Sequence, residues 1–198
     1  METQTIIFIG PQGSGKGTQI EELIKNIKEI GTDKQIVDIQ TGRRFRALAA
    51  KGEGFTERHV SKTLDSGILQ PLFLSAVLWG DAMREKLDAE SHLLIDGFPR
   101  TVPEAVVLES ALKFYRRDKI TIVNLETSEE VVKCRMVDRA RPDDTEESIE
   151  ERLRWYREET LPVVEYYRER ENATVVDVDG TLTIPEVQQQ IIDALKIN

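Results

Sequence analysis

Residues 5–18 read Thr-Ile-Ile-Phe-Ile-Gly-Pro-Gln-Gly-Ser-Gly-Lys-Gly-Thr, a short apolar run that leads directly into a glycine-rich loop. The spacing from Gly10 to Lys16 is GxxxxGK, in which glycines let the backbone curl until its N–H groups face a phosphate. The N-terminus of the next helix would add partial positive charge, and Lys16 would reach the outer phosphates. The stretch therefore predicts a strand, a phosphate-binding loop and a helix in succession. Gly17 stands where such loops usually place a serine or threonine, and the hydroxyl comes one residue later at Thr18.

Further apolar runs follow along the chain and alternate with helical patterns. Their hydrophobicity is continuous, which is typical of strands that are buried on both faces. Strands and helices that alternate in this way predict an α/β fold, a doubly wound parallel five-stranded sheet flanked by helices. The predicted strands are 5–9, 35–40, 93–96, 119–126 and 173–178. The predicted helices are 18–30, 43–50, 57–66, 72–87, 103–115, 129–139, 145–170 and 184–195.

Three local signals refine the helix ends. Pro162 is expected to kink or break the long helix 145–170, because proline lacks an N–H and collides with the preceding turn. Thr183 and Glu186 predict a capping box at the start of the last helix. Asp144 and Glu147 predict another at the start of the long helix.

The composition limits the compartment and the partners. At 198 residues the chain fits a single domain, and its net charge of −9 argues against nucleic acid as a partner. Cys134 is the single cysteine, which excludes a disulfide framework and a four-cysteine zinc site. No apolar run approaches the length of a membrane span, so we expect a cytoplasmic protein that does not enter a membrane.

Three segments resemble motifs of the adenylate kinase family, a group of P-loop nucleoside monophosphate kinases. They are Gly-Lys-Gly-Thr at 15–18, Thr-Gly-Arg-Arg-Phe-Arg at 41–46 and Asp-Gly-Phe-Pro-Arg-Thr at 96–101, the last being the most specific. The resemblance extends through nearly the whole chain. It implies a monomeric enzyme that reversibly transfers the terminal phosphoryl group of ATP, bound with Mg²⁺, to AMP. It further implies one domain with a small helical monophosphate-binding segment at about 41–70. The lid would be minimal, at about 139–144, and too short to hold structural zinc.

The same resemblance assigns roles to individual residues. ATP would be bound by Gly13, Ser14, Gly15, Lys16, Gly17, Thr18 and Arg135, the last of which would stack on the adenine. AMP would be bound by Thr41, Arg46, Leu69, Gly97, Arg100, Glu104, Arg141 and Arg152. Catalysis would depend on Lys16, Arg100, Arg139, Arg141 and Arg152, while Asp96 would orient water bound to Mg²⁺.

The chemistry of phosphoryl transfer suits this set of side chains. Negative charge spreads over the transferred group, so positioning and stabilisation by arginine, lysine and Mg²⁺ dominate catalysis. An acceptor that is itself a phosphate is already anionic and needs no general base. His59 and His92 show no partner pattern, and we expect both at surface or boundary positions.

Two features depart from the family's pattern. Between Arg139 and Asp143 lie three residues, so the lid is shorter than the family's short type. Glu104 stands where adenylate kinases typically place a glutamine that reads adenine. A carboxylate only accepts hydrogen bonds, which suits the two donors of guanine better than the acceptor N1 of adenine. We therefore expect AMP as the acceptor with weak discrimination against GMP, and Glu104→Gln should sharpen the choice toward AMP.

Two alternatives remain at the level of sequence. The same reaction could act on GMP or another monophosphate, although pyrimidine kinases of this family tend to carry alanine in place of Thr41. A non-catalytic nucleotide sensor is the other alternative, because residues 177–180 spell the DxxG of GTPases. That segment follows the last strand and the chain lacks an NKxD motif, so it reads as a turn at the end of a strand.

Overall fold

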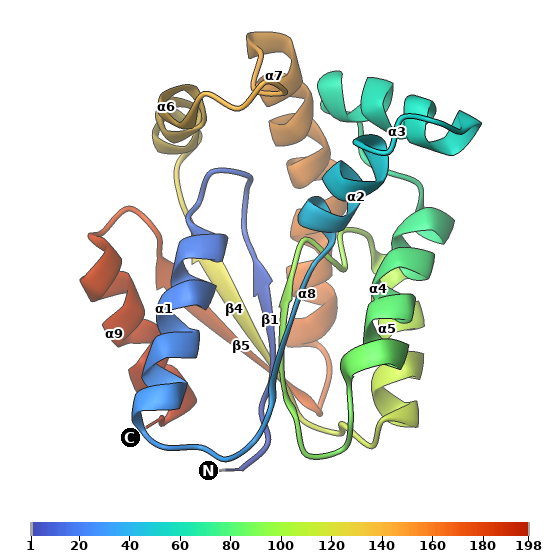
Figure 1. Ribbon diagram of the computed structural model, residues 1–198. Helices are drawn as coiled ribbons and strands as arrows, with labels where there is room; N and C mark the ends of the chain where they lie inside the picture. Colours follow the sequence, from blue (N-terminus) through green and yellow to red (C-terminus); the bar gives the residue numbers. More distant parts are fainter. Residues whose placement is uncertain (1, 198) are drawn as a thin grey trace.

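The computed structural model describes residues 2–197, which fold around one parallel five-stranded sheet (Figure 1). The order of its strands is β2-β3-β1-β4-β5, and every neighbouring pair is parallel. The strands are β1 (Thr5–Ile9), β2 (Ile36–Gln40), β3 (His92–Asp96), β4 (Ile120–Glu126) and β5 (Ala173–Asp179). The predicted α/β class and the parallel sheet are thereby confirmed.

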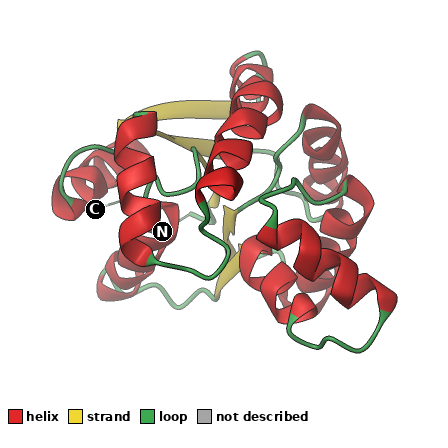
Figure 2. Cartoon of the chain, turned by 90° about the horizontal axis from the view of Figure 1, so that it is seen from above, coloured by secondary structure: helices red, strands yellow, loops and turns green. Residues whose placement is uncertain are grey.

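Helices cover both faces of the sheet, which is seen from above in Figure 2. Helices α1 and α9 pack on one face, and α4, α5 and α8 pack on the other. The helices are α1 (Lys16–Glu29), α2 (Thr41–Ala49), α3 (Phe55–Asp65), α4 (Leu72–Lys86), α5 (Val102–Phe114), α6 (Glu129–Arg139), α7 (Glu146–Trp155), α8 (Leu161–Arg168) and α9 (Ile184–Leu195). Within the described residues, no helix combines the length and the apolar character that crossing a membrane requires.

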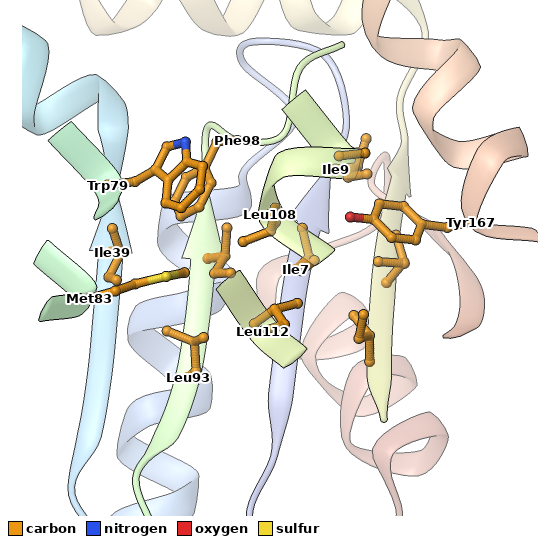
Figure 3. Close-up of a cluster of buried hydrophobic side chains, with 14 of the residues drawn as sticks. Ile7, Ile9, Ile39, Trp79, Met83, Leu93, Phe98, Leu108, Leu112 and Tyr167 are labelled. Atoms are coloured by element: carbon orange, nitrogen blue, oxygen red, sulfur yellow. The ribbon is translucent and has the colours of Figure 1, made fainter. Parts of the chain in front are cut away.

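The central strand β1 shows why both faces must be covered. Its side chains alternate, so Ile7 and Ile9 enter the core beneath α4, α5 and α8, whereas Ile6 and Phe8 enter the core beneath α1 and α9. Figure 3 shows Ile7 and Ile9 in the first of these cores, close to Tyr167 of α8. Each large apolar side chain that is buried this way contributes about 1.5–3 kcal/mol to folding. The continuous apolar run 5–9 is therefore explained by burial on two sides.

The chain order reverses at β1, and this reversal positions the site. β3 lies on one side of β1 and β4 on the other, so a crevice opens beyond the carboxyl end of β1. The loop 10–15 follows β1 directly and enters this crevice. Helices α2, α3, α6 and α7 lie above the same edge of the sheet (Figure 1).

The long helix predicted at 145–170 is interrupted earlier than Pro162. α7 ends at Trp155, a π-helical turn spans Tyr156–Thr160, and α8 begins at Leu161. Proline offers no N–H to the carbonyl four residues before it, and its ring collides with that carbonyl in a regular α-helix. The turn before Pro162 therefore widens, as π-helical bulges do elsewhere.

The two histidines lie in different environments. His59 is exposed on α3 and stacks on Phe55, as expected for a surface residue. The prediction for His92 is wrong, because this side chain is fully buried at the start of β3. Its Nδ1 accepts a hydrogen bond from the backbone N–H of Gln4 at 3.2 Å, and its Nε2 lies 3.3 Å from the hydroxyl of Thr32. Burial also lowers the pKa of His92, so the imidazole serves as a neutral structural partner.

Candidate functional site

A cleft of about 710 Å³ opens at the carboxyl edge of the sheet. It is lined by the phosphate loop, the beginning of α2, the segment after β3, and α6 and α7. Most residues that were expected to bind nucleotide lie along it: Gly13, Ser14, Gly15, Lys16, Gly17, Thr18, Arg46, Asp96, Gly97, Arg100, Arg135, Arg139, Arg141 and Arg152. Residues from both halves of the sequence thus meet in one cavity.

The phosphate loop owes its shape to its glycines. Gly13 has φ +93°, a value that residues with a side chain rarely adopt, and a Cβ there would lie 2.9 Å from the carbonyl oxygen of Val132 in α6. Lys16 begins α1 and folds back over the loop, where its Nζ donates to the carbonyl oxygens of Gly10 and Pro11, each at 2.8 Å. The ammonium group is therefore held in place by neutral oxygens of its own loop.

The surroundings of Lys16 lower the pKa of its ammonium group. Burial is the largest cause, and together with the cationic groups Arg100 and Arg139 it lowers the pKa of Lys16 to about 8. The nearby carboxylate of Asp96 opposes this shift only in part. A phosphate bound in the cleft would supply the missing negative charge and restore the proton affinity of the lysine.

Arg135 connects α6 with two loops of the sheet. Its Nη1 donates to the carbonyl oxygen of Gly180 at 2.8 Å and, less closely, to that of Ser14 at 3.4 Å. The guanidinium thus lies at the base of the phosphate loop, next to the turn that follows β5. This position is compatible with the predicted stacking on adenine, which stays a prediction.

Two arginines and two aspartates form an ion-pair network, called here the arginine cluster: Arg139, Asp143, Asp144 and Arg152. The Asp144 side chain is fully buried and receives bonds from Arg139 at 2.6 and 2.9 Å and from Arg152 at 2.6 Å. Arg152, which is 4% exposed, also donates to the carboxylate of Asp143 at 2.6 Å. Burial alone would raise the pKa of Asp144, yet the two guanidiniums hold it below its usual range.

The predicted capping box between Asp144 and Glu147 is wrong. Thr145 is the N-cap of α7, and its side chain accepts from the backbone N–H of Ser148, whose hydroxyl in turn accepts from the backbone N–H of Thr145. Asp144 directs both of its carboxylate oxygens to the arginines and not to the N-terminus of α7. The long-range ion pairs take precedence over the local capping pattern.

The connection between α6 and α7 is the segment predicted as the lid. Its two helices pack through a small apolar cluster, formed by Val132, Met136, Ile149 and Leu153. Two ion pairs tie them from outside, Lys133 with Glu150 and Glu129 with Arg157 of the π-helical turn. The helices on both sides of the connection 140–145 are thus fixed by packing and by ion pairs.

The opposite wall of the cleft is built from α2 and the segment after β3. Gly97 has φ +86°, and a Cβ there would lie 2.6 Å from the hydroxyl of Thr41. The Thr41 hydroxyl donates to the carbonyl oxygen of Gly97 at 2.7 Å and is buried rather than part of the cleft wall. Thr41 therefore supports the segment 96–101, and its predicted proximity to the acceptor base is untested. Arg46 of α2 does line the cleft, and burial lowers its pKa.

Arg100 is held by its own segment and by two residues that the sequence did not point to. Its Nε donates to the carbonyl oxygen of Gly97 at 2.7 Å, and its guanidinium lies over the ring of Trp155, 5.0 Å from the centroid. Thr160 donates to the carbonyl oxygen of Arg100 at 2.9 Å. Trp155 and Thr160 both line the cleft, but they are more than fifty positions away in sequence, and no local pattern could have revealed them.

Leu69 and Glu104 lie in a side branch of the cleft with a volume of about 30 Å³. The branch shares Phe45, Gln70, Gly97 and Arg100 with the main cleft. Glu104 is 3% exposed, and each of its oxygens accepts a hydrogen bond from the protein. The predicted base-reading residue is therefore beside the cleft and already partnered.

The cleft also offers an oxygen ligand of the kind that magnesium prefers. Asp96 ends β3 and lines the cleft, and its negative charge acts on Lys16 and Arg100. A carboxylate next to a phosphate loop can hold Mg²⁺ through one of its water ligands. Elsewhere, across residues 2–197, no three His, Cys, Asp or Glu side chains gather closely enough to hold a metal ion.

Comparison with known proteins gives a consistent result. Residues 8–172 match the family model described as adenylate kinase. The chain is 34% identical to an adenylate kinase of Corynebacterium urealyticum over 190 residues, which cover 96% of this chain and 98% of that protein. It is 36% identical to an adenylate kinase of Corynebacterium aurimucosum, with coverage of 96% and 97%. It is 35% identical to adenylate kinase 1 of a Nostoc species, with coverage of 96% for both chains.

Proposed function

The chain belongs to the adenylate kinase family, and we propose that it transfers the terminal phosphoryl group of ATP reversibly to AMP, giving two ADP. It is an ATP-dependent phosphotransferase, as its relatives are by name. The observation that carries the proposal is the gathering of Lys16 and several arginines from both halves of the chain in one cleft. Such a cleft can bind two phosphate chains at once.

The donor side of the cleft is the phosphate loop. In this proposal the backbone N–H groups of residues 13–18 and the ammonium of Lys16 bind the ATP phosphates, with Arg135 near the adenine. Asp96 would hold the Mg²⁺ that comes with ATP, through one of the water ligands of the ion, and the ion would supply charge that neutralises the phosphates. When the ATP phosphates are bound, they become the first partners of the Lys16 ammonium, and the carbonyl oxygens of Gly10 and Pro11 remain its second partners.

The acceptor side is the wall formed by α2 and the segment after β3. Arg46 and Arg100 bind the phosphate of AMP there, supported by Thr41, Leu69 and Gly97. Arg139, Arg141 and Arg152 reach the space between the two phosphate chains, where charge develops on the transferred group. The attacking phosphate oxygen is anionic, so the reaction needs no general base in the cleft.

The alternative of a non-catalytic sensor receives no support from the DxxG segment. Asp179 ends β5, and its carboxylate accepts from both the N–H and the hydroxyl of Thr181 at 2.9 and 2.6 Å. These bonds make a turn at the end of a strand. The carbonyl oxygen of Gly180 accepts from Arg135, and its N–H donates to the carbonyl oxygen of Glu126 at 2.8 Å, so both backbone groups are used within the protein.

The proposal is tested by supplying MgATP with AMP, GMP, UMP or CMP in turn and measuring diphosphate formation. AMP should give two ADP. Diphosphate formation with none of the four, from a folded protein that binds ATP, would overturn the proposal.

A matched pair of variants tests the acceptor wall. Arg46→Ala should raise KM for AMP by about ten- to a hundredfold and leave KM for ATP nearly unchanged, because a charge-assisted bond contributes about 1.5–3 kcal/mol. Arg58→Ala is the control, since within residues 2–197 this exposed arginine of α3 donates to a single group, the carbonyl oxygen of Glu53. Equal effects of the two substitutions on KM for AMP would contradict the placement of AMP on this wall.

A further inference from the structure

Glu104 is fixed by two donors from different parts of the chain. Its Oε1 accepts from the indole Nε1 of Trp79 at 3.2 Å, and its Oε2 accepts from the backbone N–H of Arg100 at 2.8 Å. Trp79 belongs to α4, is 3% exposed, and stacks on Phe98 with ring centroids 5.3 Å apart. Figure 3 shows this stack, with the indole nitrogen on the edge of the ring that points away from Met83.

These two donors require a carboxylate at position 104. An ionised glutamate presents two acceptor oxygens, whereas a glutamine presents one oxygen and one NH₂ group. With glutamine in this place, the NH₂ would face either the indole N–H or the N–H of Arg100, and one buried donor would lose its partner. Trp79 therefore favours glutamate over the glutamine that is typical of the family.

The Glu104 carboxylate lines the small pocket beside the main cleft. The side branch that contains Glu104 holds about 30 Å³, which is the room of a single water and too small for a base. A base in the main cleft would reach the branch only with its edge, through the residues that both cavities share. Each oxygen of Glu104 has a lone pair beyond the one already used, so both can still accept from that edge.

We propose that Trp79 is a positioning residue that holds Glu104 as an acceptor-only reader of the acceptor base, so that the site takes guanine as well as adenine. This inference rests on the proposed phosphotransfer to a nucleoside monophosphate. Guanine presents two donors on its pairing edge, N1–H and the 2-amino group, and both oxygens can accept from them. Adenine presents one donor, its amino group, and its N1 lone pair faces an oxygen without a proton between them. Ser75 lines the same branch, and its hydroxyl can donate to guanine O6 or accept from the adenine amine.

The experiment compares kcat/KM for AMP and GMP, at saturating MgATP, in five forms of the protein. These are the wild type, Trp79→Phe, Glu104→Gln, the double variant Trp79→Phe/Glu104→Gln, and the control Met83→Leu. Met83 lies one turn after Trp79 on α4, in the same core, and its replacement conserves volume. The wild type should use GMP within about a hundredfold of AMP, and Met83→Leu should show the same ratio.

The double variant is the decisive form. With phenylalanine at position 79, the glutamine oxygen can accept from Arg100 while its NH₂ donates to adenine N1, so the AMP-to-GMP ratio should rise about tenfold or more. Glu104→Gln alone should raise the AMP-to-GMP ratio less and weaken the binding of both nucleotides, because the NH₂ group of the glutamine would face the indole N–H, which is also a donor. A double variant that behaves like Glu104→Gln alone would overturn the positioning role of Trp79, and a constant ratio in all forms would overturn base reading by Glu104.

A second measurement does not depend on the folding of any variant. GMP should compete with AMP in the wild type, with an inhibition constant within about a hundredfold of KM for AMP. Absence of competition at a thousandfold excess would overturn the inference while leaving AMP phosphorylation intact. Lack of diphosphate formation from both nucleotides would instead overturn the proposed function.

Discussion

The phosphate loop and the arginine cluster line the same cleft, but they hold their cationic groups in different ways. Lys16 donates to neutral carbonyl oxygens that lie five and six residues away in its own loop. Arg139 and Arg152 are instead paired with carboxylates, and Asp144 bridges the two guanidiniums. Neutral oxygens compensate a positive charge only in part, whereas carboxylates neutralise it. The loop therefore awaits an anion, while the arginine cluster is already balanced before a nucleotide arrives.

The difference is visible in the proton affinities of the two regions. Burial, with little compensation, lowers the pKa of Lys16 to about 8. In the arginine cluster burial acts against the charge of Asp144 too, but hydrogen bonds from Arg139 and Arg152 overcome it and lower the pKa of this carboxyl. Substitutions in the loop should consequently affect chemistry, and substitutions in the arginine cluster should also affect stability.

The largest effect is expected for Lys16→Met. Losing a preorganised cationic contact to the transferred group should raise the barrier by about 3–4 kcal/mol and slow turnover several hundredfold or more. The melting temperature should not fall, because burying the charged ammonium destabilises the native state and the substitution removes that charge. Lys25→Met is the matched control on the exposed side of α1, where Lys25 pairs with Glu22, and its rate should equal that of the wild type. Near wild-type turnover in a folded Lys16→Met protein would exclude the loop from catalysis.

Asp144→Asn should test the balance of the arginine cluster. Removing the charge leaves two guanidiniums facing a neutral amide in a buried place, and breaking a buried ion pair costs about 3 kcal/mol or more. Urea denaturation should show this loss in the free energy of unfolding. Glu151→Gln is the control, because its ion pair with Arg154 is partly exposed to solvent and its loss should change the denaturation midpoint little. Equal midpoints for both variants would show that Asp144 does not stabilise the fold.

The smallest effect is a dependence on pH. In the free protein Lys16 loses its proton as the pH rises through about 8, so kcat/KM for ATP should fall by up to tenfold per pH unit above that value. Bound phosphates favour the charged form, and the break in kcat should therefore lie at higher pH. Because the pKa in the folded state lies below that of the unfolded chain, the cost of burying Lys16 is full below pH 8 and fades toward pH 10.5. A Lys16→Arg variant should show no break near pH 8 in its pH profile of kcat/KM for ATP, even if the variant is slow. An identical break in that variant would show that another group titrates.

Features that depend on neighbouring residues were predictable. The strand, loop and helix at 5–18, the helices 129–139 and 184–195, and the capping box of Thr183 with Glu186 all agree with the structure. Each depends on backbone geometry or on hydrogen bonds that span a few residues. The gathering of the predicted loop residues and arginines in one cleft follows from the rule that parallel strands present their carboxyl ends at the same edge.

The expectations that failed involve partners far along the chain. His92 is buried against Gln4, and Asp144 leaves its local capping position for Arg139 and Arg152. Glu104, whose predicted role in reading the base stays a prediction, likewise meets a distant partner, Trp79, which lies 25 residues away on another helix. In each case a buried polar group needs a partner, and the fold supplies that partner from a distant segment.

The amino-acid sequence alone therefore specified the α/β fold, the phosphate loop and the family motifs, because these depend on short-range geometry and on the pattern of apolar residues. Folding in three dimensions settled which charges are neutralised and which remain free. Among residues 2–197 Lys16 has no carboxylate partner, Arg152 is paired twice, and Glu104 is held by an indole. Such pairings depend on distances between elements that packing brings together, and the order of residues along the chain does not contain them.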